Sequence, residues 1–345
     1  MASKTLYAVY VDSANITSTI DPVLITMRVT DRAGMASDAV SIDLDDTDQQ
    51  IAFPRHGADM RVLLGKGSGL VEVFKGKVDD VRASGARGQG RVLKITAKGL
   101  DTKGKAKERK HKHIDKKKIS EAIKYVGQDV GITEVTVDKE LDEERDYYAL
   151  DNESVMSFAQ RLADEIGGTM RIRDNKLVIA KRGAGTTPSG ATLPTIAATW
   201  GDNLLHYDIV PVTGRARYKT VKSRYFDRKA AKWVDVEEET EDTDAEAAHS
   251  HRHPVADAKE TKGRNRNSKE TAADSKGDGT VMIDGDPTAR PEGTCIVAGA
   301  RPGIDGSYKI EGIDHTVGRS GFTTTITLKR PGEGTGKDSR KKSKK

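Results

Sequence analysis

The sequence predicts an α+β protein that is mainly β, in which two β bodies flank a small helix-plus-hairpin domain. Three observations support this fold class. Apolar and polar residues alternate through the first hundred residues, helical spacing replaces the alternation from Ile119 to Ile166, and alternation returns from about Ile196. Several short strands at close spacing are typical of a small barrel or sandwich.

The first β body is predicted from segments of alternating residues joined by glycine-bearing turns. Val40, Ile42 and Leu44, for example, alternate with polar residues, so one face of that strand is expected to be buried. The same pattern occurs in four other segments, which are 23–30, 62–64, 71–73 and 93–97. The turns between the later strands are expected at 65–69 and 85–90.

The middle of the chain predicts two amphipathic helices and a hairpin. Apolar residues from Ile119 to Val130 have helical spacing and end at Gly131, which is a typical helix stop. A second apolar stripe runs from Val155 to Ile166, where Asp151 or Asn152 can supply the N-cap. A hairpin over 170–179, turning at 174–175, follows directly and is expected to pack on this helix.

Charged residues are gathered in blocks, although the net charge is only +5, from 58 Lys and Arg against 53 Asp and Glu. Asp101–Lys118 contains nine bases and three acids, Asp235–Glu246 contains eight acids and no base, and Glu333–Lys345 contains six bases and two acids. Blocks of like charge are usually solvated, so we interpret them as a linker, an excursion and a tail. The alternative is nucleic-acid contact by the two basic blocks, although neither contains the interleaved aromatics of a base-stacking surface.

These patterns divide the chain into seven parts. They are a first β body over 1–100, a basic linker over 101–118, an α+β insert over 119–182, a linker over 183–194, a second β body over 195–234 and 280–331, a charged mobile excursion over 235–279, and a basic tail over 332–345. A short sequence echo between 73–79 and 309–314 raises the hypothesis that the two β bodies are copies of one unit.

The composition is lean for a self-contained globular protein of 345 residues. Apolar residues make up 35% and aromatic residues 5%, whereas roughly 45–50% apolar residues are usual. Part of the chain is therefore expected to be extended, looped or completed by a partner.

The single cysteine, Cys295, excludes an intramolecular disulfide framework and a cysteine-rich metal site. It is consistent with synthesis in a reducing cytoplasm. No stretch approaches the ~18 consecutive apolar residues of a membrane span, and the N-terminus lacks the apolar region of a signal peptide. We expect a soluble protein that does not insert into a membrane and is not exported by the ordinary route.

The histidines are the first candidates for metal binding. His249, His251 and His253 are closely spaced, and His111 and His113 lie in the lysine-rich block. Both groups lie in charged segments that lack cysteine or a helical pair of histidines, so a metal site is not favoured and no metal ligand is assigned.

Motifs for catalysis are also weak. The paired acids Glu143 and Glu144, or Asp164 and Glu165, are expected on solvated surfaces rather than across a cleft. The segment 65–69 lacks the spacing of a phosphate-binding loop and is better explained as a hairpin turn. We assign no catalytic or cofactor-binding residue and no cofactor, and we predict a non-enzymatic interaction protein.

Three stretches together resemble the late control protein D family, the baseplate hub proteins of contractile-tailed phages, which are similar to the N-terminal part of VgrG spikes. The first stretch contains Asp38–Leu44, Pro54–Gly57, Val62–Gly65 and Phe74–Val78. The second and most specific contains Asp151–Ser154, Phe158, Arg161–Ala163, Gly167, Gly168 and Lys176–Ile179. The third contains Asp305–Tyr308, Ile313–His315 and Gly321–Thr325.

The resemblance implies a structural hub with two tail-tube-like β-barrels per chain, assembled as a homotrimer that adapts a six-fold tail tube to a three-fold central spike. The implied partners are the tail tube, central spike, tape measure and other baseplate wedge proteins, with DNA only in transit through the channel. The implied location is the tail baseplate of the virion, after assembly in the host cytoplasm.

Passage of DNA favours a channel lining that is neutral or net acidic, and residues 235–246 are the candidate lining or rim. Two other functions stay open. One is a nucleic-acid-binding protein that uses its basic tracts, and the other is a hub with cell-wall hydrolase activity.

Overall fold

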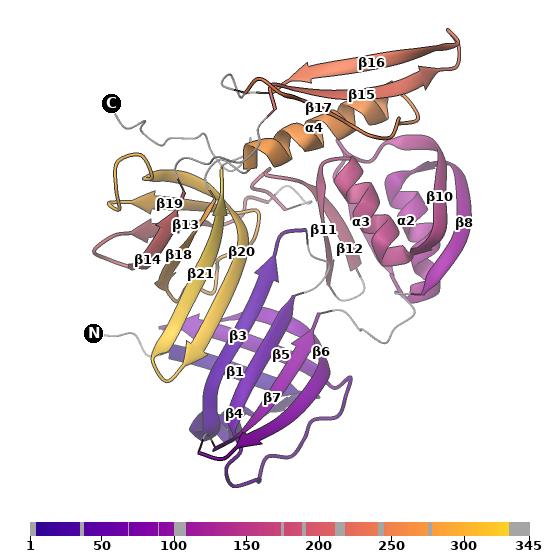
Figure 1. Ribbon diagram of the computed structural model, residues 1–345. Helices are drawn as coiled ribbons and strands as arrows, with labels where there is room; N and C mark the ends of the chain where they lie inside the picture. Colours follow the sequence, from indigo (N-terminus) through magenta and orange to yellow (C-terminus); the bar gives the residue numbers. More distant parts are fainter. Residues whose placement is uncertain are drawn as a thin grey trace.

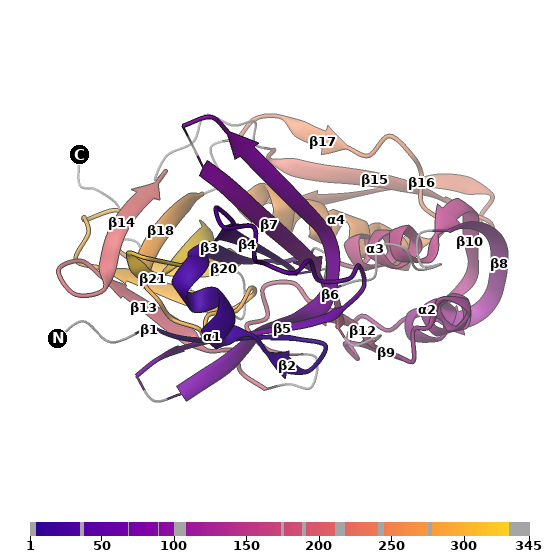
Figure 2. The same cartoon turned by 90° about the horizontal axis from the view of Figure 1, so that it is seen from below.

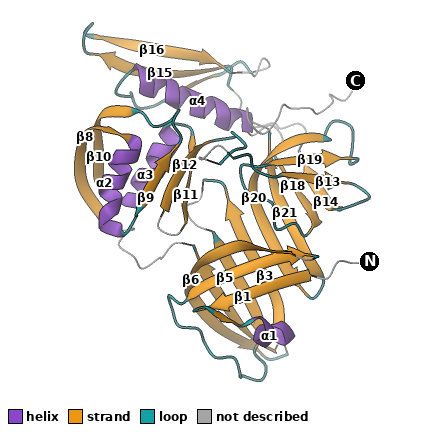
Figure 3. Cartoon of the chain, turned by 180° about the vertical axis from the view of Figure 1, so that it is seen from behind, coloured by secondary structure: helices purple, strands orange, loops and turns teal. Residues whose placement is uncertain are grey.

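The structure of the protein is a computed structural model, in which two β bodies, an insert domain and a projecting arm can be distinguished (Figure 1). The described residues are 5–34, 38–67, 69–88, 90–99, 108–173, 176–187, 191–210, 218–240, 245–274 and 278–330. Most of the described chain forms strands, and the longer helices lie in the insert domain and the arm (Figure 3). The prediction of a mainly β, α+β fold is confirmed.

The described part of the first β body contains seven strands, one short α-helix and one 3-10 helix. Its elements are β1 (Thr5–Val11), β2 (Ala14–Asn15), α1 (Thr17–Ile20), the 3-10 helix η1 (Asp21–Val23), β3 (Leu24–Arg32), β4 (Ala39–Asp45), β5 (Asp59–Lys66), β6 (Gly69–Ala86) and β7 (Gly90–Lys98). The first half of β6 pairs with β5 and its second half pairs with β7. The sheet therefore turns over on itself and encloses a core that includes Met27, Ile42 and Phe74.

The second β body contains six strands. They are β13 (Thr195–Thr199), β14 (Leu204–Ile209), β18 (Gly279–Asp284), β19 (Thr294–Ala298), β20 (Gly306–Gly318) and β21 (Gly321–Lys329). Its own core includes Tyr308 and Cys295. The second half of β20 pairs with β3, so in the described chain the two bodies share one 13-stranded sheet. Figure 2 shows β14, β18 and β21 to one side of this junction and β4, β7 and β6 to the other.

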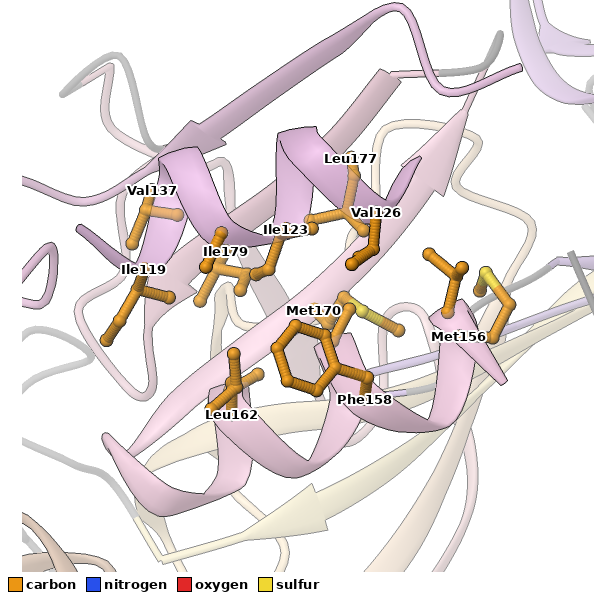
Figure 4. Close-up of a cluster of buried hydrophobic side chains, with 14 of the residues drawn as sticks. Ile119, Ile123, Val126, Val137, Met156, Phe158, Leu162, Met170, Leu177 and Ile179 are labelled. Atoms are coloured by element: carbon orange, nitrogen blue, oxygen red, sulfur yellow. The ribbon is translucent and has the colours of Figure 1, made fainter. Parts of the chain in front are cut away.

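The insert domain lies between the two β bodies in the sequence. Its elements are β8 (Arg109–Lys118), α2 (Ile119–Gly127), the 3-10 helix η3 (Gln128–Val130), β9 (Glu134–Val137), β10 (Glu144–Ser154), α3 (Val155–Glu165), β11 (Gly168–Arg173) and β12 (Lys176–Lys181). Side chains of both helices and of the strands β9, β11 and β12 meet in one core, with Ile123 of α2 and Phe158 of α3 near its centre (Figure 4). Both predicted helices and the predicted hairpin strands are confirmed.

The N-cap of α3 differs from the sequence prediction. The Ser154 hydroxyl, not Asp151 or Asn152, accepts the hydrogen bond from the Ser157 amide at 3.1 Å. The reason is that the chain remains in β10 through Ser154, so Asp151 and Asn152 lie in the strand.

The basic block also differs from the expected linker. Residues 101–107 lie outside the described residues, but Arg109–Lys118 is a strand paired with β10. Two observations explain why a block of like charge forms a strand. Lys110 and Lys112 lie 3.3 and 2.6 Å from the carboxylate of Asp129, and Ile114 enters the insert core. Part of the charge is therefore balanced by an acid outside the block.

The arm consists of β15 (Thr220–Asp227), β16 (Lys232–Glu239), β17 (Ala248–Ser250) and α4 (Ala258–Asp274). Its strands form a separate sheet. Residues 218–234 therefore belong to the arm and not, as the sequence predicted, to the second β body. Nor does 235–279 lack regular structure, because acids of β16 pair with bases of β15: Lys222 with Glu237 at 2.8 Å and Arg224 with Asp235 at 3.0 Å. Residues 241–244, 275–277 and the basic tail over 332–345 lie outside the described residues.

Candidate channel-lining face and its duplicated scaffold

The two β bodies have the same strand order. In the first body the order is β3-β4-β7-β6-β5-β1, and in the second it is β14-β18-β21-β20-β19-β13. Among the six strands in each of these orders, the fifth and sixth along the chain form the long hairpin at the centre, β6–β7 and β20–β21. One pairing differs, because β1 is antiparallel to β5 whereas β13 is parallel to β19.

Irregularities of register occur at equivalent positions in the two bodies. The β3–β4 ladder shifts between Leu24 and Thr26, and the β14–β18 ladder shifts between Leu204 and His206. The residues at these bulges, Ile25 and Leu205, are 40% and 48% exposed. Because bulges re-aim side chains at defined positions, their repetition supports duplication of one unit more strongly than strand order alone.

The central hairpins also share a bulge, which defines their equivalence. The β6–β7 ladder shifts between Val78 and Asp80, and the β20–β21 ladder shifts between Ile310 and Gly312. Asp80, not Gly76, is therefore the equivalent of Gly312. The echo between 73–79 and 309–314 indicated the correct pair of hairpins in the wrong register.

One face of the shared sheet is largely polar across eight consecutive strands, from β14 through β18, β21, β20, β3, β4 and β7 to the second half of β6, although Met282 of β18 also lies on it. The opposite side of each strand faces a core, as Val29 and Ile95 do. Eight threonines lie on the polar face: Thr26, Thr30, Thr96, Thr280, Thr316, Thr323, Thr325 and Thr327. We call this surface the threonine face.

Charges on the threonine face are balanced. The six bases are Arg28, Arg32, Arg82, Lys94, Lys98 and Lys329, and the six acids are Asp43, Asp45, Asp80, Asp208, Asp284 and Asp314. Several are paired within or beside the face, such as Arg32 with Asp314, and Lys94 with Asp43 at 3.6 Å. The face therefore presents short hydroxyl side chains and equal numbers of acids and bases, so its summed charge does not attract phosphates.

Of the residues predicted from sequence as channel lining or rim, Asp235–Glu239 belongs to β16 of the arm, on a different sheet from the threonine face. Residues 241–244 lie outside the described residues. The signal that could have located the neutral face is the alternation of threonine with apolar residues in β21, which the sequence shows clearly but which does not reveal the neighbouring strands.

The histidines do not form a metal site in the described part of the chain, where no group of three or more His, Cys, Asp or Glu side chains could hold a metal ion. The rings of His249 and His251 pack edge to face at 5.0 Å, and burial lowers the pKa of His251 to about 4. His111 pairs with Asp151 at 2.9 Å on an exposed surface. Burial raises the pKa of the Cys295 thiol to about 12, so this thiol is an unreactive core group.

Two of the four candidate carboxylates, Asp164 and Glu165, have structural partners. Asp164 pairs with Arg182 at 3.2 Å, and Glu165 pairs with Arg145 at 2.7 Å. The turn expected over 65–69 joins the antiparallel strands β5 and β6, as the hairpin interpretation requires. Among the described residues, no helix is long and apolar enough to cross a membrane.

Solved structures share this fold. The 43 kDa tail protein of prophage MuSo2 from Shewanella oneidensis aligns with 95% of this chain and 99% of its own at a TM-score of 0.72 and 16% identity. In a PdpA–VgrG complex from Francisella, one chain aligns with 99% of this chain and 60% of its own at a TM-score of 0.53 and 8% identity. The chain thus shares its fold with a phage tail protein and with a chain of a VgrG complex.

Sequence comparison identifies the family. The model of the phage tail baseplate hub family matches residues 35–321. A probable baseplate hub protein of Escherichia phage 186 is 28% identical over 222 residues, which cover 64% of this chain and 56% of that relative's length. The chain belongs to the phage tail baseplate hub family, and the resemblance inferred from its motifs is confirmed.

Proposed function

We propose that three copies of this chain form a closed ring in the tail baseplate, with the threonine faces lining the central channel. Each chain supplies two β bodies, so three chains present six similar units to a six-fold tail tube and retain three-fold symmetry towards a central spike. The observation that carries this proposal is the repeated strand order with its repeated bulges.

Two strand edges support ring closure. Within the chain, β20 of the second body pairs with β3 of the first. By the equivalence of the bulges, β14 corresponds to β3, and the second half of β6 corresponds to the second half of β20. Among the described strands, β14 pairs only with β18, and β6 pairs only with β7 beyond Lys77. Pairing β14 of one copy with β6 of the next would therefore repeat the junction that already exists within one chain.

An exposed apolar side chain near β14 supports the same contact. Met27 and Val29 of β3 are buried at the internal junction, where Val317 of β20 joins their core. Near β14, Trp200 is 51% exposed, whereas Leu205, at 48%, is about as exposed as its equivalent Ile25 is at the formed junction, at 40%. Covering Trp200 with a neighbouring copy would bury apolar surface, and pairing of β14 would protect a sheet edge that otherwise invites aggregation.

The proposal also covers the partners, the assembly and the role of the hub in the tail baseplate. The partners are the tail tube protein, the central spike, the tape measure protein and other wedge proteins of the baseplate. DNA is present only in transit, and the hub is assembled in the host cytoplasm before it becomes part of the virion. The role is structural rather than enzymatic. A neutral lining is consistent with DNA transit, since a basic channel would bind the DNA phosphates.

A disulfide between copies tests ring closure. The internal pair Thr316 and Arg28 corresponds to Ser84 of one copy and Asp208 of the next. We expect the Ser84→Cys/Asp208→Cys variant to form disulfide-linked species on oxidation that end at the trimer, with rings visible by electron microscopy. Ser84→Cys combined with Asp227→Cys, a residue of the arm, is the matched control. Absence of linked species in the first variant, or equal linkage in both, would contradict the proposed ring.

A further inference from the structure

The arm has no counterpart in the first β body. It occupies the connection between β14 and β18, whereas the equivalent connection between β3 and β4 spans only residues 33–38. A ring built from two β bodies per chain would therefore carry the arm once per chain and not once per β body. Any partner of the arm would bind with a stoichiometry of one per hub chain.

The arm is attached mainly by polar contacts. In the described chain, none of the hydrophobic core clusters contains a residue of the arm. The buried Asn265 of α4 interacts with Ser223 of β15 through a short hydrogen bond, and its amide donates to the Val236 carbonyl at 3.4 Å. Asn267 of α4 donates to the Asp164 carbonyl of the insert domain at 2.6 Å. The helix thus joins the arm sheet to the insert domain (Figure 1).

The turn end of the arm hairpin exposes two aromatic side chains. Phe226 of β15 and Trp233 of β16 are directly opposite each other and pack edge to face, with ring centroids 5.3 Å apart. They are 41% and 54% exposed, respectively. Arg224 lies 5.6 Å from the Trp233 ring and is itself paired with Asp235 at 3.0 Å. We call Arg224, Phe226 and Trp233 the aromatic tip.

The turn beside the aromatic tip is closed by hydrogen bonds within the chain. The Asp227 carboxylate accepts hydrogen bonds from the amides of Lys229 and Ala230 at 2.9 and 3.1 Å, which closes the turn. Ser223, by contrast, is directed to α4 through its bond to Asn265, so the tip lies on the ribbon surface away from the helix. Trp and Arg in a preformed arrangement are typical of the residues that contribute most to protein interfaces.

The surroundings of the aromatic tip are basic. Arg228, Lys229 and Lys232 are exposed at the turn, while the nearby acids Asp227 and Asp235 are engaged by the turn amides and by Arg224. The charge complement is therefore an acidic surface. A nucleic-acid strand is less favoured, because the two rings pack edge to face against each other rather than presenting parallel faces to bases.

We propose that the aromatic tip is a docking site for an acidic segment of another tail protein, bound once per hub chain. An apolar side chain of this segment packs against Trp233 and Phe226, and its carboxylates face Arg228, Lys229 and Lys232. The site is independent of ring closure, because it uses no residue of β14 or β6.

A photo-crosslinking experiment in assembled tails tests the contact. The photoreactive analogue p-benzoylphenylalanine replaces Trp233, and the same analogue at Tyr125, which is 49% exposed on α2, is the control. We expect the Trp233 position alone to link to a peptide of a different virion protein that contains several acidic residues. A link to DNA, a link to a second hub chain, a partner peptide without acidic residues, or no link would overturn the proposal.

Binding measurements with the identified peptide test the chemistry. Phe226→Ala/Trp233→Ala and, separately, Arg228→Glu/Lys229→Glu/Lys232→Glu should each weaken binding of full-length hub at least tenfold. Trp233→Phe should retain most of the affinity. Lys222→Ala is the control, because Lys222 lies on the same strand but pairs with Glu237, and its affinity for the peptide should be unchanged. Unchanged affinity in either the double or the triple variant would overturn the proposal. Ring formation is measured separately and tests the proposed function, so failure of one can be told from failure of the other.

Discussion

Arg171 of β11 forms an ion pair with Asp31 of β3, although the two residues are 140 positions apart in the sequence. Asp38 lies just before β4, and its carboxylate is 3.3 Å from the same guanidinium. On the other side of the hairpin, Glu292 of the second β body accepts hydrogen bonds from the Thr169 hydroxyl at 3.1 Å and the Gly183 amide at 2.6 Å. The hairpin of the insert domain is therefore fixed to both β bodies.

Replacing Arg171 with Met should destabilise the protein. Burial opposes the charge on this guanidinium, but Asp31 and Asp38 outweigh that effect and raise its pKa. The variant leaves the largely buried carboxylate of Asp31 without its cation, so we expect a loss of about 3 kcal/mol in the free energy of unfolding. Denaturant titration measures the change. Arg61→Met, which removes a more exposed pair with Glu72, is the control and should cost less than about 1 kcal/mol.

His315 should make stability depend on pH. Burial, followed by the nearby Arg290, lowers its pKa to about 4, although Asp31, Asp286 and Asp314 act in the opposite direction. The folded state thus disfavours the charged form that the unfolded chain gains below about pH 6.5. We expect up to about 3 kcal/mol of stability to be lost progressively between pH 6.5 and pH 4.

The comparison with His315→Gln isolates this effect, because glutamine can still hydrogen-bond to Thr324, which lies 3.0 Å from the histidine ring. The difference in unfolding free energy between the two proteins should change over the same pH range. A constant difference would show that His315 is not the responsible group.

Gly76 of β6 is required by a close approach of the backbone. A Cβ atom at this position would lie 2.2 Å from the carbonyl oxygen of Lys98, and a backbone atom cannot move aside easily. Gly76→Ala should therefore lower the free energy of unfolding by about 2 kcal/mol or more. Gly69→Ala on the same strand is the matched control, since a Cβ there meets nothing within 4 Å and should be nearly neutral.

The N-cap of α3 can be tested by two alanine substitutions. Ser154→Ala removes the acceptor of the Ser157 amide and should cost about 1 kcal/mol. Asp151→Ala should cost less than about 0.5 kcal/mol, because the ion pair of Asp151 with His111 is exposed. Thermal or urea unfolding of both variants distinguishes the observed cap from the one that the sequence indicated, and a larger loss in Asp151→Ala would contradict the structure.

The sequence by itself determined the local elements. Alternation in β4 and β21 predicted strands with one buried face, and the apolar stripes of α2 and α3 predicted helices that end at glycine-bearing turns. These predictions succeeded because the spacing of apolar residues depends only on the period of each element. The motifs around α3 also carried enough information to indicate the family.

The tertiary structure decided how these elements combine. The pairing of β20 with β3 joins residues that are almost a whole chain apart, and it creates the threonine face from strands that no local pattern connects. The charged blocks were misjudged for the same reason: Lys112 is balanced by Asp129 and Arg224 by Asp235, so segments that look repulsive along the chain become strands. Long-range register and charge pairing depend on the folded chain, so the pattern of neighbouring residues in the sequence does not determine them.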